Sequence, residues 1–215
     1  VVGTCKKHGT LVRFKPDASI FTTVEFKWDT IASHLQESAF LMKGVEFVLT
    51  DEKTGTVQNF LYENGLVEYI NNVNINKNPL SPVISFSDTD EETQIDIEIA
   101  LQYCNEDYNE TIFSYVNNVR TRDGGTHETG FRAGITKAVN DFAETYKLTK
   151  GKKLEGSDIR EGLTAVIALK VPEGLLQFEG QTKGKLGTAE ATSVVQNLIY
   201  NKFTYYLTEN KEIAL

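Results

Sequence analysis

The chain has 215 residues, of which 40% are apolar and 24% charged, and its net charge is −8. These proportions are ordinary for a globular protein with its own apolar core, in one large domain or two modest ones. The acidic balance argues against a surface that binds nucleic acid everywhere, although it leaves room for a local basic face. No run approaches the roughly eighteen apolar residues of a membrane span, and no signal peptide opens the chain.

The two cysteines, Cys5 and Cys104, lie far apart and show no metal-ligand spacing. We expect two thiols in a reducing compartment rather than a disulfide. The three histidines also form no metal-ligand pattern, so we expect no metal site. Val1 at the first position predicts a fragment or a processed product.

The first part of the chain predicts a strand, a helix, a hairpin and a second helix, in that order. Thr10–Phe14 alternates in character and runs into a turn, as a strand does. Asp29 offers N-cap chemistry before apolar residues at helical spacing. Two strand-like runs, 45–49 and 57–62, flank a Lys-Thr-Gly turn and predict a hairpin. Apolar spacing over 66–73 predicts the second helix.

The middle of the chain predicts the strands of a sheet. Pro82 leads into a new strand, and 112–116 forms another. In Ile95–Tyr103, apolar residues alternate with polar ones, which predicts one buried face and one polar face. The near-continuous apolar run 163–171 is typical of an interior strand.

Two long helices complete the prediction. The first follows Gly124-Gly125, with Thr126 as its cap, and its apolar stripe consists of Phe131, Ile135, Ala138, Val139, Phe142 and Tyr146. Residues 147–156 predict an exposed loop. Apolar residues over 194–207 predict a C-terminal helix that Thr188 caps. Strands and helices alternate irregularly, so the fold class is α+β, with a mixed sheet under helices.

One glycine-bounded segment is a candidate for anion contact. Gln181 and Lys183 lie between Gly180 and Gly184, in a predicted mobile loop that no apolar residue anchors. An amide and a cation on such a loop are able to reach a phosphate. The loop has no Walker-type pattern, so it does not cradle a nucleotide by itself. These residues alone favour the alternative, a solvated loop.

A second glycine-bearing segment, 122–128, precedes the first long helix. Free amides in the first turn of a helix are able to hold an anion, but a structural turn and cap is the favoured interpretation. His127 has no partner carboxylate at useful spacing except Glu128, which a helix directs elsewhere, and no Ser/His/Asp or Cys/His set is present. Basic residues close in sequence predict one basic face at most: Arg120, Arg122, Arg132 and Lys137.

Seven short stretches recur in a known order along nearly the whole chain. They are Gly9–Asp17, Glu37–Leu41, Tyr62–Gly65, Val116–Val119, Arg122–His127, Arg160–Val166 and Phe178–Lys183. Each is weak alone, but the ordered set is specific, and it resembles the B subunits of bacterial type IIA DNA topoisomerases. Leu154–Asp158 and Leu175–Phe178 favour topoisomerase IV of Gram-positive type, with the DNA gyrase B subunit as the alternative.

The resemblance implies two domains. Residues 1–64 would be the C-terminal piece of a GHKL ATPase domain, and residues 65–215 a transducer domain, with a mixed sheet covered by helices and a long C-terminal helix. Thr10 matches the threonine near the adenine end of the nucleotide pocket. Gln181 and Lys183 match the pair that reaches the γ-phosphate. In this context a phosphate contact becomes preferred over a solvated loop.

The resemblance also implies partners. The intact subunit is expected to use ATP and Mg2+, to pair with a second B subunit and the DNA-cleaving A subunit, and to act on DNA in the bacterial cytoplasm, without a membrane. The basic residues named above are candidates for facing DNA, with solvated charges as the alternative.

The same resemblance implies limits on what this chain does by itself. The catalytic glutamate, the magnesium-binding asparagine, the adenine-binding aspartate and the glycine-rich lid of the family precede the stretch that matches Gly9. We therefore expect neither bound ATP nor enzymatic activity from this chain alone. The alternative of another class is a free-standing, non-catalytic anion-binding or interaction protein.

Overall fold

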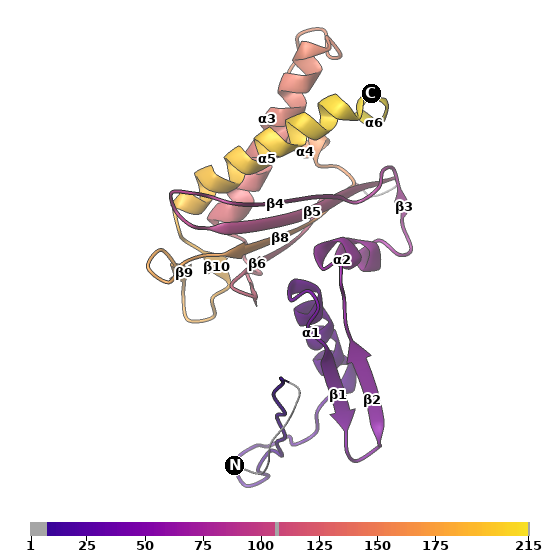
Figure 1. Ribbon diagram of the computed structural model, residues 1–215, viewed down its shortest axis with the longest axis vertical. Coiled ribbons are helices and arrows are strands. Elements are labelled where there is room, and N and C mark those ends of the chain that lie inside the picture. The colour runs from indigo at the N-terminus through magenta and orange to yellow at the C-terminus, as the bar shows by residue number, and fades with distance from the viewer. Residues whose placement is uncertain (1–7, 106–107, 215) are drawn as a thin grey trace.

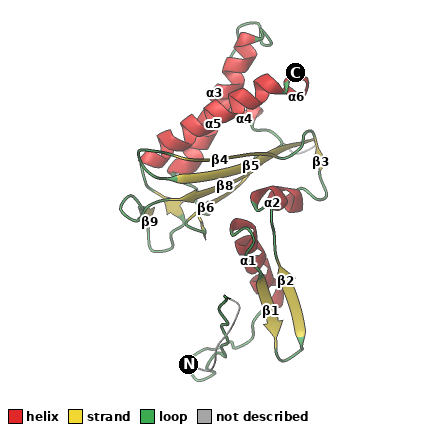
Figure 2. Ribbon diagram, viewed as in Figure 1, coloured by secondary structure: helices red, strands yellow, loops and turns green. Residues whose placement is uncertain are grey.

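The structure is a computed structural model that describes residues 8–105 and 108–214. Cys5 and Val1 lie outside this range. A helix and a hairpin form one end of the molecule, a sheet lies in the middle, and two long helices cover the sheet on the side away from the hairpin (Figures 1 and 2). The predicted α+β class, with a mixed sheet and a long C-terminal helix, is confirmed.

The N-terminal unit consists of helix α1 (Trp28–Leu41) and the hairpin of β1 (Phe47–Asp51) and β2 (Thr56–Phe60). Both were predicted. The predicted cap is wrong, because α1 begins after Lys27, which makes no side-chain cap bond, and Asp29 lies within the first turn. There its negative charge still favours the positive end of the helix dipole.

The predicted strand at Thr10–Phe14 is wrong. This segment is coil, and Leu11 and Val12 are 93% and 73% exposed. A strand needs a neighbour for its backbone N–H and C=O groups. Among the described residues, no strand pairs with the segment Thr10–Phe14.

The central sheet has the order β3-β5-β8-β6-β7, and β4 pairs with β5. Its strands are β3 (Asn78–Pro79), β4 (Ile84–Thr89), β5 (Asp96–Asn105), β6 (Thr111–Val116), β7 (Val119–Arg120) and β8 (Leu163–Lys170). β8 runs antiparallel to β5, with Ile167 opposite Ile99, and parallel to β6, with Ile167 opposite Ser114. The sheet is therefore mixed, and its most apolar strand is interior, as predicted.

Helices α3 (Thr126–Thr145) and α5 (Glu190–Glu209) pack side by side on one face of the sheet (Figure 1). In the predicted stripe of α3, Val139 and Tyr146 are partly buried and the other four residues are buried. Gly130 and Gly134 let the helices approach closely: a Cβ on Gly134 would overlap the Ile199 side chain. The sheet and the two helices thus share one apolar core.

The other face of the sheet is covered in part by α2 (Leu66–Val73). The predicted polar face of β5 is therefore partly covered rather than solvent-exposed throughout, because Ala100 and Gln102 are buried beneath this helix and its surroundings. The Gln102 amide is satisfied there: it accepts from Asn74 Nδ2 at 2.9 Å and donates to the Ser81 carbonyl at 2.8 Å.

Short elements complete the fold: α4 (Gly156–Ile159), β9 (Phe178–Glu179), β10 (Lys185–Leu186) and α6 (Lys211–Ala214). Both remaining cap predictions are wrong. Thr126 is the first residue of α3, whose N-cap is Gly125, and α5 begins after Ala189. The Thr188 hydroxyl instead accepts from the Gln177 N–H and donates to the Leu175 carbonyl. In the described part of the chain, no helix is long and apolar enough to cross a membrane.

Candidate functional site

The glycine-bounded segment is the tip of a short hairpin. β9 and β10 pair antiparallel, with Leu186 opposite Phe178, and residues 180–184 connect them. Gln181 and Lys183 are both exposed at this tip. Gly180 (φ +78°) and Lys183 (φ +55°) have left-handed backbones, which turn the chain sharply. The Lys183 side chain therefore projects from a bent, solvent-facing loop.

The two lysines of this hairpin differ in their partners. Lys185 Nζ lies 3.2 Å from Glu179 Oε2 and forms an ion pair. Lys183 has no carboxylate partner within residues 8–105 and 108–214, and its Nζ lies 5.8 Å from the centre of the Phe178 ring. Lys183 is thus the cation of the loop that remains available to an anion.

The base of the hairpin is anchored to the second glycine-bearing segment. Asp123 N donates to the Gly184 carbonyl at 2.9 Å, and Leu186 N donates to the Gly124 carbonyl at 3.1 Å. Leu186 is fully buried and also forms a parallel bridge with Gly125. The expectation that no apolar residue anchors the loop is therefore wrong. Folding brings the two candidate segments into direct contact.

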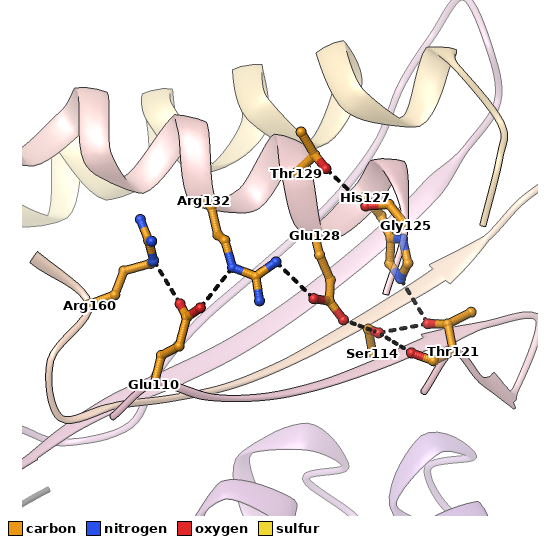
Figure 3. Close-up of polar contacts among 9 residues, drawn as sticks. All are labelled: Glu110, Ser114, Thr121, Gly125, His127, Glu128, Thr129, Arg132 and Arg160. Carbon is orange, nitrogen blue, oxygen red and sulfur yellow. Dashed lines mark hydrogen bonds and ion pairs between the residues drawn. The ribbon is translucent and has the colours of Figure 1, made fainter. Parts of the chain in front are cut away.

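A buried chain of polar groups starts just beyond this contact (Figure 3). His127 Nε2 lies 3.0 Å from Thr121 Oγ1, which lies 2.6 Å from Ser114 Oγ. Ser114 Oγ donates to Glu128 Oε1 at 2.6 Å. Glu128 does point away from His127, as expected, but two hydroxyl groups connect them. Burial, with a smaller contribution from Arg132, lowers the pKa of His127 to about 4.

The chain of polar groups continues through two arginines (Figure 3). Arg132 contacts Glu128 Oε2 at 2.9 Å and Glu110 Oε1 at 2.9 Å, and Arg160 contacts Glu110 Oε2 at 2.7 Å. No local sequence pattern had indicated that Glu110, Ser114 and Arg160 belong to this network. The pair Glu128 and Arg132 could have been found from the sequence, because residues four apart face each other on a helix.

The remaining basic candidates lie in different surroundings. Arg120 Nη1 is 3.3 Å from Glu37 Oε1, and Lys137 Nζ lies 4.0 Å from the centre of the Tyr200 ring. Arg122 is exposed and, where the structure describes the chain, pairs with no carboxylate. A polar pocket of about 390 Å³ is lined by Ile112, Ser114, Arg120, Thr121, Arg122 and Glu128. Of the four basic candidates, Arg120 and Arg132 are therefore the two whose charge is paired with carboxylates of the protein itself.

Thr10 is not brought to the loop. It is exposed in the N-terminal coil, which lies apart from the β9–β10 hairpin (Figure 1).

The described part of the chain contains no group of three His, Cys, Asp or Glu side chains placed to hold a metal ion.

The site is a lysine-bearing hairpin on an α+β fold, anchored at the start of α3, and comparison with known sequences shows which family has this fold. The profile of the DNA gyrase B family matches residues 65–215, so the chain belongs to this family. The chain is 47% identical to the B subunit of DNA topoisomerase 4 from Bacillus subtilis and 50% identical to that from Streptococcus pneumoniae, in each case over 99% of its length. It spans 32% and 33% of those two proteins, about a third of their length.

Solved structures agree with this assignment. The 43K ATPase domain of Thermus thermophilus gyrase B, in complex with an aminocoumarin, matches 94% of the chain with a TM-score of 0.78 and 33% identity. The match covers 54% of that domain. The B subunit of DNA gyrase from Myxococcus xanthus gives a TM-score of 0.79 at 25% identity, over 91% of this chain and 61% of that one. The expected family and fold are confirmed.

Proposed function

We propose that this chain is the region of a type IIA DNA topoisomerase B subunit that couples ATP binding and hydrolysis to DNA strand passage. Identities of 46–50% to topoisomerase 4 B subunits favour topoisomerase IV. The equivalent region of the DNA gyrase B subunit is the alternative. The observation that carries the proposal is the position of Lys183, exposed and without a carboxylate partner in the described residues, on a hairpin with an anchored base.

We further propose a domain boundary at Gly65, with the end of a GHKL ATPase domain before it and a transducer domain from there to residue 215. The family profile begins at residue 65, which supports this division. Gly65 has a left-handed backbone (φ +54°) at the start of α2. The α1–hairpin unit also has its own small apolar cluster, built on Ala32, Ala39 and Phe60.

In the proposed mechanism Lys183 recognises the terminal phosphate of ATP. Bound ATP supplies a γ-phosphate that hydrolysis removes. Lys183 Nζ donates a charge-assisted hydrogen bond to that group, and the Gln181 amide adds a neutral one. The contact exists only in the ATP state, so the position of the hairpin reports the state of the nucleotide. Thr10 would act at the adenine end, which requires the N-terminal coil to lie at the same pocket.

The Mg2+ that the intact subunit uses with ATP would be held at the family's magnesium-binding asparagine, which precedes the stretch that matches Gly9. The partners that we propose for the intact subunit are a second B subunit, the A subunit and DNA, in the bacterial cytoplasm. Of the four basic candidates, Arg122 is the most available to DNA phosphates and Lys137 is the next, because carboxylates already hold Arg120 and Arg132.

Substitution of Lys183 in the intact B subunit, assembled with its A subunit, tests the proposal. Lys183→Ala removes a charge-assisted bond worth about 1.5–3 kcal/mol, so ATP turnover should fall roughly tenfold or more. Gln181→Ala should have a milder effect. DNA relaxation should fall with turnover. Folding stability should change by less than about 0.5 kcal/mol, as for most surface substitutions.

Lys185→Ala is the matched control, since it removes the same charge two positions away from a lysine that Glu179 already holds. Its turnover should stay close to wild type. Wild-type turnover and relaxation in Lys183→Ala would show that the loop is merely solvated and that the assignment is wrong.

A further inference from the structure

The contact between the turn at 123–125 and β10 has a consequence for Lys183. Both backbone hydrogen bonds and the bridge described above attach to Gly184 and Leu186, directly after this lysine. Leu186 follows Lys183 by three positions, and three residues span at most about 10 Å. The place where β10 is held therefore limits where the Lys183 ammonium group can lie.

Gly125 has no room for a side chain at this contact. A Cβ there would lie 2.6 Å from Leu186 N and 2.9 Å from Leu186 Cα, and still closer to the Leu186 carbonyl oxygen. Carbon atoms in good contact are about 3.5–4.0 Å apart, so β10 or the turn would have to move. The Gly125 backbone (φ +141°, ψ −163°) also lies in a region that essentially only glycine adopts.

The atoms that meet Gly125 cannot yield easily. They belong to the backbone of Leu186, whose side chain is fully buried in the main core. Gly184, in the same contact, differs: a Cβ on it would meet the end of the Asp123 side chain, which is exposed and free to rotate. A methyl group at Gly125 therefore displaces the hairpin, whereas a methyl group at Gly184 displaces one side chain.

On its other side, Gly125 is fixed to α3. Its carbonyl accepts hydrogen bonds from the Thr129 N–H at 3.1 Å and from Thr129 Oγ1 at 3.2 Å (Figure 3). His127, two residues further on, is fully buried. The turn is thus a rigid extension of the helix. The loop that carries Lys183 takes its position from α3 through Gly125.

We infer that Gly125 is a positioning residue for the phosphate contact of Lys183: its missing side chain lets β10 dock on the start of α3 and so sets the place of the lysine. The inference rests on the function proposed for Lys183. It adds that the 122–126 segment acts through the hairpin, rather than by binding an anion itself.

The test compares Gly125→Ala, Lys183→Ala and the double variant in the intact B subunit assembled with its A subunit. Displacing a reacting group by about 1 Å can cost on the order of a hundredfold in rate, so ATP turnover in Gly125→Ala should fall by more than about tenfold. If both residues act through one contact, their effects are not additive, and the double variant should stay within about twofold of the worse single variant. Multiplicative losses would overturn the inference. Gly55→Ala, at a left-handed glycine (φ +74°) with open space around it, controls for backbone strain and should keep wild-type turnover.

Amide hydrogen exchange without nucleotide gives a readout independent of turnover. In Gly125→Ala the amides of Asp123 and Leu186 should exchange faster, while amides in the β5–β8 pairing stay protected. If that pairing also loses protection, the variant has unfolded, and the same exchange measurement is then made on Gly124→Ala. There the three heavy atoms nearest to the added Cβ (φ +70°) all belong to the Glu128 carboxylate, the closest at 3.0 Å, and the Gly124 carbonyl accepts from Leu186 N. The fold should therefore survive, while β10 shifts less than in Gly125→Ala.

These outcomes separate the two proposals. Wild-type turnover in Lys183→Ala would sink the proposed function. Reduced turnover in Lys183→Ala combined with normal turnover in a glycine variant whose Leu186 amide exchanges faster would sink only the inference about Gly125. Unchanged exchange at Leu186 in both glycine variants would show that the turn does not hold the hairpin.

Discussion

Protonation of His127 should destabilise the fold as the pH falls. This side chain is fully buried, its Nε2 faces the Thr121 hydroxyl, and its Nδ1 finds no hydrogen-bond partner among the described residues. Its surroundings offer a positive guanidinium at Arg132 and a carboxylate at Glu128 that two other groups already occupy. A charged imidazole there would be desolvated without a counter-ion, which is why its pKa is lowered to about 4.

The sign of the effect follows from the direction of this change. The folded protein holds His127 neutral, whereas the unfolded chain protonates it near the ordinary value of 6.5. The contribution of the neutral ring to stability is therefore complete above about pH 6.5 and is lost between 6.5 and about 4. That difference corresponds to about 3 kcal/mol in total, of which about 2 kcal/mol is lost by about pH 5.

Urea unfolding of the 215-residue chain at pH values between about 7.5 and 5, followed by circular dichroism, measures this loss. Other groups of the chain also take up protons as the pH falls, so the informative quantity is the difference from His127→Gln. Glutamine carries an amide at about the reach of Nε2 but takes up no proton. The wild type should lose about 2 kcal/mol more than this variant. Parallel curves for the two proteins would refute the account of a buried, neutral histidine.

Two further outcomes test the core and the limits of the chain. Phe142→Ala, at a side chain only 5% exposed between α3 and the sheet, should lower the free energy of unfolding by about 3–5 kcal/mol, and a change below about 1 kcal/mol in urea unfolding would contradict that packing. The 215-residue chain alone should show no ATP turnover and no ATP binding tighter than about millimolar by calorimetry; tighter binding would contradict the proposal that most of the nucleotide pocket comes from other residues.

The long helices and the central strands of this protein could be predicted because their apolar residues recur with the period of a helix or a strand. The α3 stripe and the apolar run of β8 depend on neighbours within a few residues, so local patterns suffice. The caps could not be predicted in the same way. Thr188 has cap chemistry, but its hydroxyl bonds to Leu175 and Gln177, more than ten positions earlier, and that preference is decided by the hairpin between them.

The candidate site divides along the same line. Local spacing identified Lys183 as a glycine-bounded cation, and the family resemblance supplied its expected partner. The sequence did not predict that Leu186 anchors the loop, because its contact with Gly125 joins residues far apart in the chain. The bond of Arg160 to Glu110 spans 50 positions for the same reason. Such pairs depend on the order of the strands in the sheet, and that order cannot be predicted from the spacing of neighbouring residues.

The strand order also dictates when the sheet can be completed during synthesis. β8 lies between β5 and β6, yet it is the last of these three strands to be made, and all of α3 precedes it. Until residue 170 leaves the ribosome, β5 has only β3 and β4 beside it, and its other edge, with Ile97, Ile99 and Leu101, lacks a neighbour. Open apolar strand edges invite association with other chains. Translation that stalls between β6 and β8 would therefore leave two such edges, one on β5 and one on β6, open on the same nascent chain.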